Sequence, residues 1–203
     1  MNWKQRLTRR NLTALLVAVL VFGTLGAAEG LYQRAFGEES WGYAFDNIEA
    51  EFGETVDVDH AWATVYDFEA SYLVKTAEYE NQALRSNGIF LVVRMRTANP
   101  GPGINDLGEA HIVYSDGRST ETLGGAYRVP KQGFQEDGVI YFEVDPDRLV
   151  GARLTLFQKE LTHRYRTRAV IDLGIDDAKA ADLRATPADK VITLTKPEYR
   201  AIG

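Results

Sequence analysis

The sequence predicts an all-β domain of the sandwich type, carried on a single N-terminal transmembrane helix. Short stretches of alternating apolar and polar residues recur at intervals of about ten residues, with turn-forming residues between them, which is typical of a β-sandwich. No sustained helical period occurs between residues 55 and 157. The transmembrane helix is indicated by one uncharged run, residues 12–28, that follows a cationic tip.

The uncharged run indicates the compartment in which the protein works. At about 1.5 Å rise per residue it nearly crosses a hydrocarbon core of roughly 30 Å. The cations that precede it resist translocation, and they are Lys4, Arg6, Arg9 and Arg10. We therefore expect a single-pass protein of the cell membrane, with residues 1–11 in the cytoplasm and the C-terminal domain outside. A signal peptide cleaved near residue 28 is the alternative, and it leads to the same compartment.

Small residues recur four positions apart within this run. The pairs are Ala14 with Ala18 and Gly23 with Ala27. Such spacing lets a second helix approach closely, so we expect these residues to pack against helices of a partner complex in the lipid bilayer. The alternative is that Gly and Ala are simply frequent in membrane helices.

Composition excludes several classes of function. The formal net charge is −6, and removing the four cations of the tip leaves −10 for the rest of the chain. This acidic balance argues against nucleic-acid binding and against adhesion by charge to anionic lipid. The chain has no cysteine, which excludes disulfides, thiolate catalysis and Cys-ligated metals. An exported domain of this size without disulfides is more usual for bacteria.

Residues 29–50 are expected to form a juxtamembrane linker, and residues 51–203 the folded domain. Aromatic residues in the linker suit the membrane interface, although alternation of Trp41, Tyr43 and Phe45 would also fit a strand. Residues 38–59 hold eight carboxylates. We interpret them as a solvated acidic face, with a cation site at Asp57 and Asp59 as the alternative.

The first half of the domain predicts two long strands. Residues 55–66 alternate and place Trp62 as a core anchor. Asn87-Gly88 predicts a tight turn, and the clearest strand, residues 89–97, follows it. Its predicted core side chains are Ile89, Leu91, Val93 and Met95, and its predicted outward side chains are Arg94 and Arg96.

The second half continues with short strands. These are expected at residues 110–114, 139–144, 153–157, 163–173 and 191–195, with a turn at residues 115–117, a flexible Gly124-Gly125, a loop at 130–138 and one short helix at 176–184. Ile140 and Phe142 are expected in the core.

Three arginines alternate in the strand at residues 163–173. Arg164, Arg166 and Arg168 would project from one side at intervals of about 6.5 to 7 Å, a row that could meet an anionic polymer. The other interpretation is a solvated face whose charges pair with neighbouring acids.

Several segments resemble the DUF4352 group, which comprises immunoglobulin-like domains of bacterial membrane-anchored proteins and lipoproteins. They are Gly53-Glu54-Thr55, residues 88–99 (GIFLVVRMRTAN), Ser115-Asp116-Gly117 and residues 138–144 (GVIYFEV). The resemblance spans about residues 52–158 and implies an immunoglobulin-like fold and an exported location. It implies no catalytic residue, and the lipid-attachment cysteine of many relatives is missing here.

The sequence holds no recognisable catalytic constellation. Nucleophile motifs, a phosphate-binding loop and the H-E-x-x-H zinc motif are all absent, and His60, His111 and His163 are about fifty residues apart. We therefore expect no enzyme, no cofactor and no metal site, but an extracytoplasmic accessory subunit that docks on a transporter or respiratory assembly. The alternative is a free-standing sensor or adhesin that binds an anionic polymer through the arginine row. The sequence names neither the partner nor a small-molecule ligand.

Overall fold

A computed structural model of the protein describes residues 44–58, 61–76, 83–101, 107–126, 129–157 and 165–202. Phe45–Gly203 forms one compact unit. In this described part of the chain, no helix is long and apolar enough to cross a membrane. The predicted transmembrane segment and its residues Ala14, Ala18, Gly23 and Ala27 lie outside the described residues, so the anchor stays a prediction.

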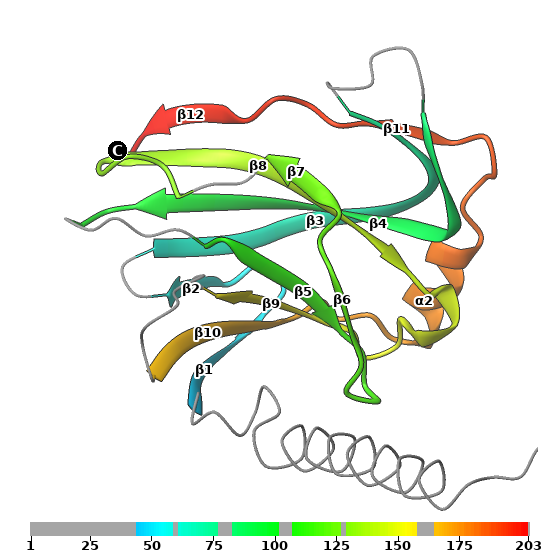
Figure 1. Ribbon diagram of the computed structural model, residues 1–203, viewed down its shortest axis with the longest axis horizontal. Helices are drawn as coiled ribbons and strands as arrows, with labels where there is room; N and C mark the ends of the chain where they lie inside the picture. Colours follow the sequence, from blue (N-terminus) through cyan, green and yellow to red (C-terminus); the bar gives the residue numbers. More distant parts are fainter. Residues whose placement is uncertain are drawn as a thin grey trace, which may run out of the picture. The chain divides into compact units, whose positions relative to one another are not determined.

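The described strands form two sheets that face each other (Figure 1), which confirms the predicted β-sandwich. Sheet A has the order β1-β10-β9-β5-β6, with β1 at Ala44–Glu51, β10 at Tyr165–Asp172, β9 at Arg153–Phe157, β5 at Glu109–Val113 and β6 at Ser119–Glu121. Sheet B contains β2 at Thr55–Val58, β3 at Ala61–Lys75, β4 at Leu84–Asn99, β7 at Gly124–Ala126, β8 at Phe134–Val144, β11 at Val191–Thr193 and β12 at Glu198–Ala201.

Sheet B is built on three long antiparallel strands, β3, β4 and β8. Two short strands share the outer edge of β3, because β2 pairs with its first residues and β11 runs parallel to its last ones. Two more share the outer edge of β8, where β12 pairs with its start and β7 with its middle. Between Phe90 and Ala98 the central strand β4 is therefore paired on both sides by these ladders.

The main core lies between the sheets. Inward side chains of β4 and β8 meet those of β5, β9 and β10, and the largest fully buried ones include Ile89, Leu91, Met95, Ile112, Ile140, Phe142, Leu154, Leu156 and Ile171. Burial of Leu91, Val93, Ile140 and Phe142 confirms those core predictions. The prediction for Trp62 is wrong, since its alternation sets the indole on the outer face of β3, where it is 39% exposed.

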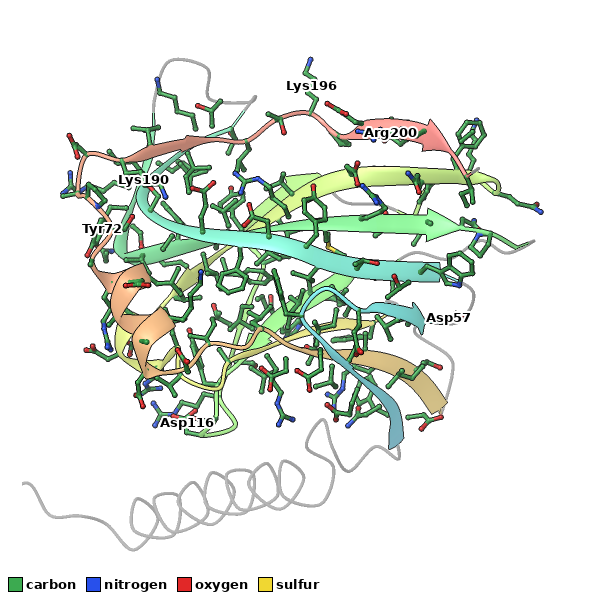
Figure 2. All side chains as sticks on the ribbon, turned by 180° about the vertical axis from the view of Figure 1, so that it is seen from behind. Asp57, Tyr72, Asp116, Lys190, Lys196 and Arg200 are labelled. Atoms are coloured by element: carbon green, nitrogen blue, oxygen red, sulfur yellow. The ribbon has the colours of Figure 1, made fainter. Side chains whose placement is uncertain are left out.

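A second apolar cluster lies on the outer face of sheet B. Its buried members are Val74, Phe90, Val92, Val139, Tyr141 and Ile192. Residues 191–202, which we call the C-terminal strap, supply Ile192 together with the half-buried Leu194. The strap is fixed at both ends, because Leu194 N donates to Lys75 O at 2.8 Å and Ile202 N donates to Gly133 O at 2.9 Å. In Figure 2 the C-terminal segment follows sheet B from Lys190 to Arg200.

Two predicted breaks are continuous strand in the structure. Asn87 and Gly88 lie inside β4, so the predicted turn is wrong, and Gly124-Gly125 forms part of β7. Both Gly88 and Gly125 admit a close backbone neighbour: a Cβ on Gly88 would lie 2.5 Å from Val144 O. Glycine is needed at these two positions because a neighbouring strand passes too close for a Cβ atom. A prediction based on turn-forming residues does not take this packing into account.

Three segment boundaries also need correction. Residues 44–50 belong to β1 rather than to a linker, as the alternation ending at Phe45 had suggested. The predicted loop at 130–138 is shorter, because β8 already begins at Phe134. β12, which follows Pro197, was not predicted.

The short helix was predicted correctly. α2 spans Asp177–Arg184, and Asp176 caps its N-terminus by accepting a hydrogen bond from Lys179 N at 2.8 Å. Ala180 and Leu183 are buried, and the ammonium of Lys179 lies 5.2 Å from the centre of the Phe68 ring on β3. The helix is thereby packed against sheet B. The predicted turn at residues 115–117 is present as well.

We predict that Gly88→Ala lowers the free energy of unfolding by about 1–3 kcal/mol, because the added methyl group must displace the backbone of β8. Gly101→Ala is the matched control, since a Cβ there meets nothing within 4 Å and the glycine has no positive φ. Urea unfolding measures both. Equal stability of the two variants would contradict the close approach.

The strap yields a second prediction. Ile192→Ala should cost about 2–4 kcal/mol of unfolding free energy, because it removes a buried side chain from the outer cluster. The neighbouring Val191 is exposed, so Val191→Ala should cost less than about 1 kcal/mol. If the two changes have the same effect on urea unfolding, the strap does not pack as described.

Candidate functional site

A cluster of charges crosses the outer face of sheet B next to the strap. Arg94 Nη1 donates to Asp67 Oδ2 at 2.6 Å, and Arg94 Nη2 donates to Glu69 Oε1. Lys190, just ahead of the strap, places Nζ 2.8 Å from Glu69 Oε2. The cluster therefore ties the C-terminal segment to β3 and β4, and its charges are engaged with one another.

The electrostatics of this cluster favour its ionised form. Burial opposes ionisation of Glu69, but hydrogen bonds from Lys190 and Arg94 outweigh it and hold the pKa of that carboxyl below its ordinary value. Burial likewise disfavours the charged Arg94, but its bonds to Glu69 and Asp67 outweigh this and raise its pKa. Glu69 and Arg94 therefore stay charged across the neutral range.

Beyond the charge cluster, the outer face of sheet B carries the exposed side chains of Trp62, Tyr66 and Arg96. We call this region the open half-face and define it by Trp62, Thr64, Tyr66, Arg96 and Asp137. Arg96 Nε donates to Asp137 Oδ1 at 2.7 Å, and its guanidinium lies 5.9 Å from the centre of the Tyr66 ring. Burial and the negative charge of Asp137 raise the pKa of Tyr66, so its hydroxyl stays protonated.

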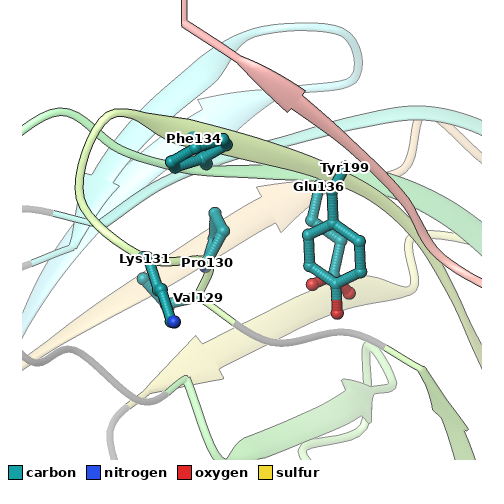
Figure 3. A pocket seen from close by; sticks show the side chains of 6 residues that line it. All are labelled: Val129, Pro130, Lys131, Phe134, Glu136 and Tyr199. Carbon is teal, nitrogen blue, oxygen red and sulfur yellow. The ribbon is translucent and has the colours of Figure 1, made fainter.

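A pocket opens at the free end of β8 and β12 (Figure 3). Its volume is about 460 Å³, and its lining residues are Val129, Pro130, Lys131, Phe134, Glu136 and Tyr199. Phe134 and Tyr199 are 44% and 61% exposed, whereas Glu136 is almost wholly buried. Tyr199 lies opposite Glu136 in the ladder between β12 and β8. The pocket can accept an apolar or aromatic group whose polar edge meets Lys131 or the tyrosine hydroxyl.

Sequence reasoning missed this pocket. Phe134 was predicted in the loop at 130–138 and no strand was predicted at Tyr199. Both residues line the pocket because β12 pairs with the start of β8. The available signal was weak: alternation in Glu198–Ala201 directly after Pro197, where an edge strand tolerates the proline.

The predicted arginine row is described only at Arg168. Its Nε donates to Asn47 Oδ1 at 2.9 Å, and its guanidinium lies 4.4 Å from the centre of the Phe45 ring. Arg168 thus links β10 to β1 within sheet A. Arg164 and the side chain of Arg166 lie outside the described residues, so contact of the row with an anionic ligand stays a prediction.

The acidic and histidine candidates are also placed. Trp62 Nε1 donates to Asp57 Oδ2 at 3.3 Å, and His111 Nε2 lies 3.5 Å from Glu109 Oε2 on sheet A. Asp59, His60 and His163 lie outside the described residues. Across the described ranges, no group of three or more His, Cys, Asp or Glu could hold a metal ion.

Two facing sheets around one core place the protein in the class of all-β sandwich proteins. No family model and no curated protein sequence matches the chain. A solved structure similar to it is an uncharacterized β-sandwich protein from Clostridium difficile 630, with 14% sequence identity and a TM-score of 0.40. That similarity covers 63% of this chain and 95% of the other. The resemblance to the DUF4352 group stays a prediction.

The charge cluster makes stability depend on pH. Because the pKa of Glu69 is lowered by folding, its ion pairs stabilise the fold above the ordinary glutamate value of about 4.3 and lose this effect as pH falls through the lower folded value. We predict that wild type is more stable than Glu69→Gln at pH 7 and that the difference shrinks between about pH 5 and pH 3. The exposed Glu121→Gln is the control. A pH-independent difference in urea unfolding would contradict this assignment.

Proposed function

We propose that the protein is a membrane-anchored, extracytoplasmic binding subunit that docks on a larger membrane protein complex and catalyses no reaction itself. The observation that carries this proposal is the pocket at the free end of β8 and β12, where two exposed aromatic rings flank a concave, largely apolar surface. The uncharged run at residues 12–28 supports the membrane anchor.

The pocket has the character of a protein-docking site. Aromatic side chains, tyrosine above all, are enriched at the centres of interfaces because they contribute a large contact area for few rotatable bonds. Phe134 and Tyr199 meet this description, and Lys131 adds a polar rim. A partner can insert one apolar side chain here without rearranging the rigid ladder that holds β8 and β12.

The charges of sheet B favour binding over catalysis. General acid–base chemistry needs a titratable group poised near the working pH. Folding instead lowers the pKa of Glu69 and Glu143 and raises those of Arg94 and Arg96, which moves all four away from neutrality. Such groups stabilise a structure rather than exchange protons during a reaction.

The remaining parts of the proposal come from the sequence. Ala14, Ala18, Gly23 and Ala27 would pack the anchor against helices of the partner complex. An immunoglobulin-like arrangement and kinship with the DUF4352 group are compatible with two antiparallel sheets on an exported protein. The anionic-polymer function has less support, since Arg168 is engaged with Asn47 and Phe45.

Site-specific photo-crosslinking in the native membrane tests this function. We predict that a photoreactive phenylalanine analogue at Tyr199 of the full-length chain crosslinks to a discrete partner in the membrane fraction. The same analogue at Leu123, an exposed site on the β6–β7 connection, should give no such adduct.

Two results would contradict the proposal. Absence of an adduct from Tyr199, or identical adducts from both positions, would remove the docking pocket. Recovery of the full-length chain in the soluble fraction would remove the anchor.

A further inference from the structure

The open half-face of sheet B is a second candidate surface, separate from the docking pocket. Trp62 and Tyr66 project from β3 with 39% and 42% of their surface exposed. Tyr66 continues the outward alternation of Trp62 and Thr64 along β3, and it lies next to Arg96. At about 3.3 Å per residue, four residues of strand set the two rings roughly 13 Å apart. That separation matches a short chain of rings rather than a single small molecule.

Both rings are held by polar neighbours. The indole of Trp62 is oriented by its hydrogen bond to Asp57 on β2, and Arg96 lies over the ring of Tyr66. Between them, the hydroxyls of Thr55 and Thr64 are 2.7 Å apart. Side chains fixed before a ligand arrives lose little conformational entropy on binding, so this arrangement is preorganised.

The charges on this sheet face favour a neutral ligand. Four cations and four acids of this sheet face engage one another in ion pairs, and they are Arg94, Arg96, Lys190, Arg200, Asp67, Glu69, Asp137 and Glu198. The paired groups sum to no net charge, so they attract neither a polyanion nor a polycation at long range. Their oxygens and N–H groups can still form directed hydrogen bonds with a neutral polar ligand.

We propose that the open half-face binds a neutral polysaccharide chain. A pyranose ring presents an apolar C–H face that can pack on an indole or phenol ring, and hydroxyl groups at its rim that can bond to Asp57, Arg96 and Asp137. Ala98 lies beside Trp62 in the ladder and is buried, whereas the indole keeps 39% of its surface exposed. This function goes beyond docking on a membrane partner, because it uses a different surface.

Isothermal titration of the full-length protein in lipid nanodiscs tests this inference. The probes are three neutral hexasaccharides (chitohexaose, cellohexaose and maltohexaose) and one anionic hexasaccharide of hyaluronan. We expect at least one neutral probe to bind, with an affinity that changes less than twofold between 50 and 300 mM salt, roughly the range over which exposed charges become screened.

The variants assign binding to the two rings. Trp62→Ala and Tyr66→Ala should each weaken binding by roughly tenfold or more, whereas Trp62→Phe should retain part of it. Tyr199→Ala, which removes an exposed aromatic ring from the docking pocket, should leave glycan affinity unchanged. Urea unfolding midpoints within error of wild type show that the variants fold, and Trp62→Phe serves where Trp62→Ala does not fold.

Three outcomes would overturn the inference: no neutral probe binds, binding survives both alanine changes, or the hyaluronan probe binds more tightly and loses affinity with salt. The photo-crosslink at Tyr199 is read independently, so failure here leaves the docking proposal standing, and the reverse also holds.

Discussion

Burial of β4 on both of its faces is the constraint on which the rest of the structure depends. Between Ile89 and Val93 every side chain is buried, the odd positions against sheet A and the even positions against the strap and its neighbours. A strand in this position must be apolar on both sides, paired on both edges and covered from outside. The strap supplies the cover, and β3 and β8 supply the pairing. Beyond Arg94 only Arg96 of β4 is exposed, while Met95, Thr97, Ala98 and Asn99 stay buried.

This division explains where binding surfaces can lie. The apolar side chains under the strap are already buried in the folded domain, and their burial stabilises the fold rather than a complex. The charge cluster of Asp67, Glu69, Arg94 and Lys190 marks the boundary and ties the C-terminal segment to the sheet. Past it, aromatic rings remain accessible on the open half-face and in the pocket that β12 completes. The domain thus has two separate surfaces that we propose as binding surfaces.

Much of the fold could be predicted from local pattern, and the failures have physical causes. Alternation identified the inward residues of β4, and composition identified the helix that Asp176 caps. The uninterrupted apolar run Ile89–Val93 also indicates a strand that is buried on both faces. We interpreted it as an alternating strand and predicted only its odd positions in the core. A turn was predicted at Gly88 from the Asn87-Gly88 dipeptide. The sequence does not show how closely the backbone of Val144 approaches this glycine. Trp62 was predicted in the core because residues 55–66 alternate, but alternation does not show which face is inward, and Trp62 and Thr64 lie on the outer face. The pocket joins residues more than sixty positions apart, and the pairing of β12 with β8 brings them together. The charge cluster joins residues more than one hundred positions apart, and the path of the C-terminal segment brings them together.

Hydrogen–deuterium exchange of the full-length protein tests the central claim most directly, because amide protection reports which segments open together. If the strap covers β4, peptides spanning residues 191–194 should exchange slowly, on the timescale of peptides from residues 89–93, despite their position near the C-terminus. Exchange of residues 191–202 within seconds, while residues 89–93 remain protected, would show that β4 is covered without the strap and would contradict this account.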